Sequence, residues 1–82
     1  MPYIKQEARE VFESVVLPGV ATAGELNYFI TKLCQHYIAD HGLNYQTLND
    51  ITGALENCKL EFYRRLTAPY EDTKIKENGD VF

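Results

Sequence analysis

The 82-residue chain has few cysteines, which stabilise small proteins as disulfides, and few basic residues, which bind to negatively charged surfaces. It contains two cysteines and no tryptophan, and its 12 acidic residues outnumber its 8 lysines and arginines, which leaves a net charge of −4. Two cysteines do not make the disulfide framework of a small secreted domain, so Cys34 and Cys58 are predicted to be reduced and buried within helices. The acidic balance argues against general binding to nucleic acid or to anionic membranes, which requires a basic surface.

Long apolar runs are also missing. No stretch is long enough to span a bilayer, and the first ten residues have no apolar signal core, so we expect a cytoplasmic protein. The length fits one domain, 1–82. A chain of this size buries only a modest core, and its stability therefore often depends on a partner.

The apolar pattern that is present predicts an all-α fold of three helices, at about 5–17, 23–41 and 45–67. The link between the second and third helices is short, which favours an antiparallel hairpin with the first helix packed across it. The second helix is apolar on more than one side, and another copy of the chain would hide that surplus most simply. We therefore expect a homo-oligomer. The polar segment 69–82 is expected to be an irregular tail, with a small hairpin at Asn78-Gly79 as the alternative.

Residues at the helix ends support these boundaries. Thr22 and Glu25 have the spacing of a capping box before the second helix, and Gly42 suits the left-handed position that ends it. Asn44 can cap the third helix, and Pro69 is expected to stop it because the residue before a proline avoids helical geometry.

The third helix is long for so short a chain, and one apolar stripe runs along it. The stripe has spacings of three and four residues: Tyr45, Leu48, Ile51, Leu55, Cys58, Phe62 and Leu66. Gly53 lies inside this helix and indicates a close helix–helix contact.

The main candidate binding site lies where the third helix ends. It consists of Lys59, Tyr63, Arg64, Arg65 and Tyr70. Arginine grips phosphate through a planar fork and tyrosine offers a face on which a base stacks, so this set suits a nucleotide-like ligand. Alternatively, the arginines pair with nearby acidic residues and stabilise an interface. Both hold if the ligand lies between subunits.

A second polar set lies on the second helix. Asn27 and Tyr28 are its candidate ligand contacts, with Thr31 and Gln35 following Asn27 at intervals of four. A buried asparagine either fixes pairing register or binds a ligand, and the first interpretation is favoured here.

No pattern indicates catalysis, a cofactor or a metal. Cys34, His36 and His41 do not share a helical face, as a zinc site would require. No phosphate loop, dinucleotide fingerprint or nucleophile motif is present. Glu71 and Asp72 are the carboxylates that a small hydrolase would use, and surface carboxylates of this kind are usually only solvated.

Four segments carry a resemblance to a known family. MPYI at the start, GELNYFIT at 24–31, LNDITGALENCKLEFYRR at 48–65 and PYEDTKIKENGDVF at 69–82 resemble a family of small phage, prophage and bacterial proteins of unknown function. The resemblance implies a phage or prophage setting, supplies no site residues and suggests that segment 69–82 has a role. Some small helical, oligomeric phage proteins sequester nucleotide immune signals, and this chain is similar to them in kind, not in motif.

Three functional hypotheses follow. The first is a non-enzymatic protein that sequesters a nucleotide-derived host immune signal, such as a cyclic nucleotide or an ADP-ribose-like molecule, at a subunit interface. The second is a protein–protein interaction module that inhibits or adapts a host or phage protein. The third, a small hydrolase, is the least favoured.

Overall fold

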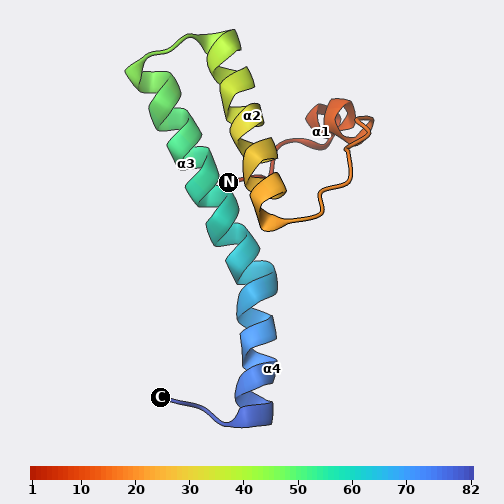
Figure 1. Cartoon of the computed structure of the whole chain (residues 1–82), viewed down its shortest axis with the longest axis vertical. Helices are drawn as coiled ribbons and strands as arrows, with labels where there is room; N and C mark the ends of the chain where they lie inside the picture. The colour runs from red at the N-terminus through yellow and green to blue at the C-terminus, as the bar shows by residue number, and fades with distance from the viewer. The chain divides into compact units, whose positions relative to one another are not determined.

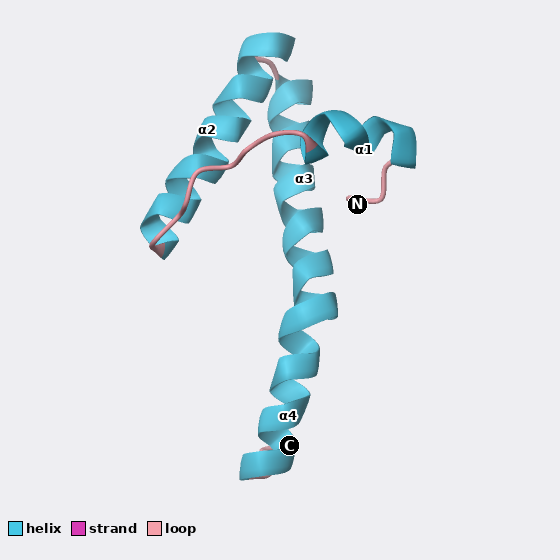
Figure 2. Ribbon diagram, turned by 90° about the vertical axis from the view of Figure 1, so that its right-hand side faces the viewer, coloured by secondary structure: helices cyan, strands magenta, loops and turns pink.

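A computed structural model describes all 82 residues and contains helices and loops but no strand (Figures 1 and 2). In chain order the elements are α1 (Gln6–Glu13), α2 (Ala23–His41), α3 (Tyr45–Phe62), the π-helical turn η1 (Tyr63–Thr67) and α4 (Ala68–Asn78). The predicted all-α class is confirmed. The chain divides into two compact units, Tyr3–Thr52 and Gly53–Phe82 with Met1–Pro2, and the boundary falls within α3.

Helix α1 is shorter than predicted. The expected helix reached residue 17, but α1 ends at Glu13, where the Ser14 hydroxyl donates a hydrogen bond to the Val11 carbonyl oxygen over 3.0 Å. Serine favours such local bonds over continuing a helix. Two β-branched residues and the restriction that Pro18 places on its neighbour then keep the following residues out of helical geometry.

Helix α2 has the predicted bounds, 23 to 41. At its start the Thr22 hydroxyl accepts a hydrogen bond from the Glu25 amide over 3.1 Å, and the Glu25 carboxylate lies 3.5 Å from the Ala21 amide nitrogen. At its end Gly42 has φ +90° and ψ 155°, and its amide donates to the Ile38 carbonyl over 2.7 Å. The glycine therefore supplies the positive φ that was predicted, with a more extended ψ than the left-handed helical region.

The first unit contains the predicted hairpin of α2 and the start of α3. The two helices run antiparallel and are joined by the short link 42–44 (Figure 1). Asn44 caps α3 as expected, since its side-chain oxygen accepts from the Thr47 amide over 2.9 Å. Across the hairpin the Tyr37 hydroxyl donates to the Asp50 carboxylate over 3.4 Å.

Residues 53–78 of the second unit form one continuous helical segment, and two predictions about this segment were wrong. Pro69 does not stop the helix but lies in the first turn of α4. The preceding turn, η1, widens to the π pattern, in which the Ala68 amide donates to the Tyr63 carbonyl five residues earlier. A proline inside a regular helix lacks an amide donor and presses on the carbonyl four residues before it. The π turn relieves that conflict by changing the register just before the proline.

The predicted irregular tail, 69–82, is also wrong, because α4 continues to Asn78. Gly79, with φ +93°, ends the helix and donates its amide to the Ile75 carbonyl over 2.8 Å. Asn78-Gly79 is thus a helix C-terminus and not a hairpin turn, which is the usual place for glycine.

Neither unit has an apolar core of its own. No apolar side chain is buried, and the one buried residue is Thr47, at 3% exposure. Cys34 is half-buried and Cys58 is exposed, both as free thiols, so the prediction that both are buried was wrong for Cys58 and only partly met for Cys34. Large apolar side chains on every helix therefore remain available for contacts beyond those present in the chain.

Candidate binding site

The five residues predicted at the end of the third helix lie along one helical segment of the second unit. We call them the arginine–tyrosine cluster: Lys59 in α3, then Tyr63, Arg64 and Arg65 in η1, and Tyr70 in α4. The π turn therefore forms the middle of the cluster. All five side chains are exposed, but they are spread around the helical segment, since residues two apart such as Tyr63 and Arg65 do not share a side.

Tyr63 is tied to α4. Its hydroxyl donates a hydrogen bond of 2.6 Å to the Glu71 carboxylate, eight residues later. This bond, and the repulsion between that carboxylate and a phenolate, raise the pKa of Tyr63 above its usual value of 10.0, and Asp72 adds a smaller effect. Tyr63 is therefore a protonated hydrogen-bond donor at neutral pH.

The three cations of the cluster differ in their partners. Arg64 forms an ion pair with Glu61, one turn earlier, and Lys59 lies 3.6 Å from the Glu56 carboxylate. Arg65 is exposed and forms no ion pair or side-chain hydrogen bond within the chain. An anion approaching this surface would find Arg65 open, while Arg64 already has a carboxylate beside it.

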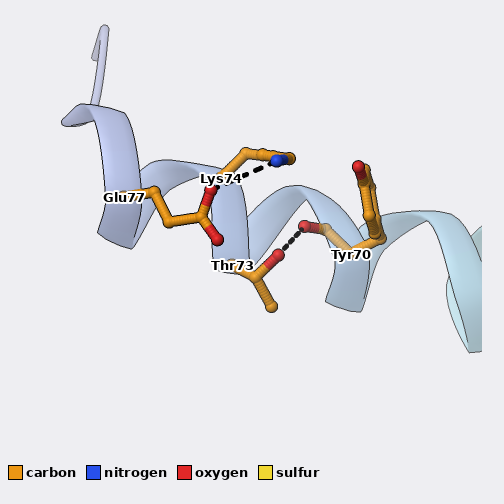
Figure 3. Close-up of polar contacts among 4 residues, drawn as sticks. All are labelled: Tyr70, Thr73, Lys74 and Glu77. Atoms are coloured by element: carbon orange, nitrogen blue, oxygen red, sulfur yellow. Dashed lines mark hydrogen bonds and ion pairs between the residues drawn. The ribbon is translucent and has the colours of Figure 1, made fainter.

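Tyr70 has a cation next to its ring that the sequence analysis missed. The Lys74 ammonium lies 5.5 Å from the ring centroid and also pairs with Glu77 over 3.1 Å (Figure 3). The Thr73 hydroxyl donates to the Tyr70 carbonyl over 2.6 Å on the same turn. The spacing of four residues between Tyr70 and Lys74 would have revealed this contact if 69–82 had been recognised as a helix.

The other two predicted site residues, Asn27 and Tyr28, lie on α2 in the first unit. The Thr31 hydroxyl donates to the Asn27 carbonyl over 2.9 Å and lies 3.4 Å from its side-chain oxygen. The Lys32 ammonium lies 5.4 Å from the Tyr28 ring centroid. Both residues are exposed and interact with their own helix, which is local pairing of the i, i+4 kind.

The residues considered for metal binding have other contacts. His36 lies 3.5 Å from the Asp40 carboxylate, and the His41 ring stacks on Tyr37 with centroids 3.9 Å apart. No three histidine, cysteine or acidic side chains gather as they would around a metal ion. None of the helices combines the length and the apolar character needed to cross a membrane.

Comparison with known proteins gives one family. A family model described as "Domain of unknown function (DUF6899)" matches residues 1–81. No curated protein matches the chain. No solved structure matches it either.

Proposed function

The chain belongs to this family, whose description assigns no activity, and we propose that it is a non-catalytic binding protein that associates with another protein through the apolar surfaces of its helices. The resemblance of segments such as PYEDTKIKENGDVF to phage and prophage proteins suggests the setting. There, in the cytoplasm of a host bacterium, the chain would inhibit or adapt a host or phage protein, for example one of a defence system.

One observation carries this proposal: the chain buries no apolar side chain of its own. On α2, Leu26 and Leu33 are 50% and 56% exposed and lie seven residues apart, on one side of the helix. Complete burial of such a side chain gains about 1.5–3 kcal/mol. A partner protein that covers this surface would supply the burial that the chain lacks.

The surroundings of Tyr63 bear on the hydrolase hypothesis. The raised pKa of Tyr63 favours its neutral form, whereas a tyrosine that acts as base or nucleophile needs its anion near neutral pH. The Glu71 carboxylate, which a hydrolase would need to be free, accepts the Tyr63 hydroxyl instead.

Sequestration of a nucleotide-derived signal is a second candidate, and Arg65 favours it. This guanidinium is exposed and has no acidic partner within the chain, although the helical spacing puts it on a different side of the segment from the Tyr63 ring. An exposed arginine without an acidic partner suits a phosphate group. The acidic residues that hold Tyr63 and Arg64 would have to tolerate or release these groups on binding.

Site-specific cross-linking tests the first candidate. A photo-crosslinking residue replaces Leu33 in the full chain produced in bacteria, and the same residue replaces Gln35, exposed on the far side of α2, as the matched control. We expect a protein adduct from position 33 only, and loss of that adduct on Leu26→Asp. The identified protein should form a complex of fixed stoichiometry with the purified chain. Adducts between copies of the chain alone, equal labelling from both positions, or no complex from purified components would overturn the proposal.

A thermal-shift screen tests the second candidate. The panel contains linear and cyclic dinucleotides, cyclic trinucleotides, and ADP-ribose with its cyclic forms. A ligand at a hundred times its dissociation constant stabilises the folded state by about 2.7 kcal/mol. The expected result is a raised melting temperature that Arg65→Ala removes, with the ligand recovered intact. A cleaved ligand would contradict sequestration, and no shift with any compound would remove this candidate.

A further inference from the structure

The second unit leaves one apolar strip without a covering element of its own. Phe62, Leu66 and Tyr70 follow each other at intervals of four residues along α3, η1 and α4, and are 60%, 57% and 61% exposed. We propose that this strip, called the seam, packs antiparallel against the seam of a second copy of the chain. The inference goes beyond the proposed function, because it concerns the second unit and names the chain itself, not a foreign protein, as the partner of the seam.

The π turn is what keeps the seam on one side. In a regular helix of about 3.6 residues per turn, each step of four residues rotates the side chain by roughly 40°, so three such residues spiral away from a common face. A π turn holds more residues per turn and offsets that rotation. The Tyr63–Glu71 hydrogen bond supports this geometry, since residues eight apart across η1 meet on one side of the segment.

The charges beside the seam indicate the antiparallel direction. Lys59 lies four residues before Tyr63, and Glu71 meets Tyr63 directly, so both charges flank the seam on the same side. A two-fold axis near residues 64–66 places Lys59 of one copy opposite Glu71 of the second copy, twice in the dimer. In a parallel, in-register pair, Lys59 would lie level with Lys59 and Glu71 level with Glu71, so the lysine–glutamate pairs could not form.

Both flanking groups can make these contacts. Lys59 and Glu56 are highly exposed and 3.6 Å apart, an arrangement that contributes little and exchanges readily. The ionised Glu71 carboxylate is only a hydrogen-bond acceptor. It accepts one hydrogen bond from Tyr63, so it has lone pairs left for an ammonium group. The surface is therefore complementary to itself, which favours a second copy over an unrelated protein.

The need for a partner follows from the state of this segment. Within its unit it is a single helical segment, and isolated helices are only marginally stable in water. Packing the seam of one copy on that of another covers one phenylalanine, one leucine and one tyrosine from each chain. Aromatic residues are enriched at such interfaces.

A matched pair of leucine substitutions tests the seam. Leu66 lies in the seam, whereas Leu60, similarly exposed at 54%, lies away from it, roughly 120° or more round α3 from Phe62. Sedimentation equilibrium of the full chain should show a dimer that Leu66→Asp dissociates and Leu60→Asp preserves, with circular dichroism confirming helix content in both. A monomeric unmodified chain, or equal effects of the two substitutions, would overturn the proposal.

Charge exchange tests the direction. Lys59→Glu and Glu71→Lys each place like charges opposite each other, and we expect each to weaken the dimer about tenfold or more. The double substitution should return the dissociation constant to within about threefold of the original, because opposite charges face each other again. Tyr63→Phe, which removes the bond to Glu71 without changing charge, should have a much smaller effect. Failure of the double substitution to restore the dimer would exclude the antiparallel register.

The two proposals fail separately. A dimer without any cross-linked foreign protein from position 33 would leave the seam in place and remove the proposed function. A specific complex with a foreign protein, formed by a chain that is otherwise monomeric, would support the proposed function and exclude the seam dimer.

Discussion

Replacing Pro69 with alanine tests whether this proline lies in a strained helix interior or in a helical turn that accommodates it. In the interior of a regular helix, proline is about 3 kcal/mol less favourable than alanine, so Pro69→Ala would stabilise the fold by that amount. In this chain Pro69 lies in the first turn of α4, directly after the π turn. There the preceding π turn accommodates the missing amide, and the fixed φ of proline lowers the entropy of the unfolded chain, worth about 0.4–1 kcal/mol. We therefore expect Pro69→Ala to destabilise slightly or to have no effect.

Thermal unfolding followed by circular dichroism measures this difference. For a chain of this length, 1 kcal/mol corresponds to a shift in Tm of about 4–8 °C. Thr73→Pro, in the middle of α4, calibrates the assay and should lower stability by about 3 kcal/mol. A rise in stability of about 3 kcal/mol on Pro69→Ala would show that the π turn does not relieve the proline and would refute the reasoning.

Two further predictions concern single hydrogen bonds. Asn44→Ala removes the acceptor of the Thr47 amide and should lower the free energy of unfolding by about 1 kcal/mol, while Asn44→Asp retains it; chemical denaturation compares the two. Glu71→Gln should lower the pKa of Tyr63 towards 10.0, measured by phenolate absorbance against Tyr63→Phe. Because the pKa of Tyr63 is raised on folding, its stabilising effect is complete below pH 10.0 and is lost as pH rises through the folded-state value. An unchanged Tyr63 titration in Glu71→Gln would contradict the assignment of the shift to this bond.

Local patterns predicted α2 and the start of α3 well, but not the end of α1. Thr22, Gly42 and Asn44 mark helix ends through interactions within a few residues, and such interactions depend little on the rest of the chain. The hairpin of α2 and α3 follows from the short link between them. Thr22 and Gly42 also fix the length of α2, because they mark its start and its end.

The second half could not be predicted from the same rules, because Pro69 admits two outcomes. The residue before a proline is biased away from helix, but a preceding π turn permits the helix to continue. Choosing between these outcomes requires knowing that Tyr63 reaches Glu71 across the turn. A stop at Pro69 would leave segment 69–82 as a polar tail, whereas the π turn lets the helix continue to Asn78.

The candidate site was predicted in composition but not in pairing. The sequence grouped Lys59, Tyr63, Arg64, Arg65 and Tyr70, and the structure places them along one segment. The sequence alone could not show which acidic residue each cation contacts, because several acidic residues lie within reach of the flexible lysine and arginine side chains. That distinction leaves Arg65 as the cation without an acidic partner in the chain.

The seam and the anion hypothesis are physically linked through Arg65. An antiparallel pair with its axis near residues 64–66 brings Arg65 of the two copies close together, on the same side of the dimer. The two like-charged guanidinium groups repel each other and so oppose association. An anion bound between them would attract both and favour association instead. Dimerisation and anion binding must then strengthen each other by the same factor, since linkage between binding equilibria is reciprocal. Pyrophosphate or ADP-ribose should therefore tighten the dimer, and Arg65→Ala should abolish that response while strengthening the dimer without ligand. A dimer whose dissociation constant is indifferent to both the anion and Arg65 would place the axis elsewhere and separate the two hypotheses.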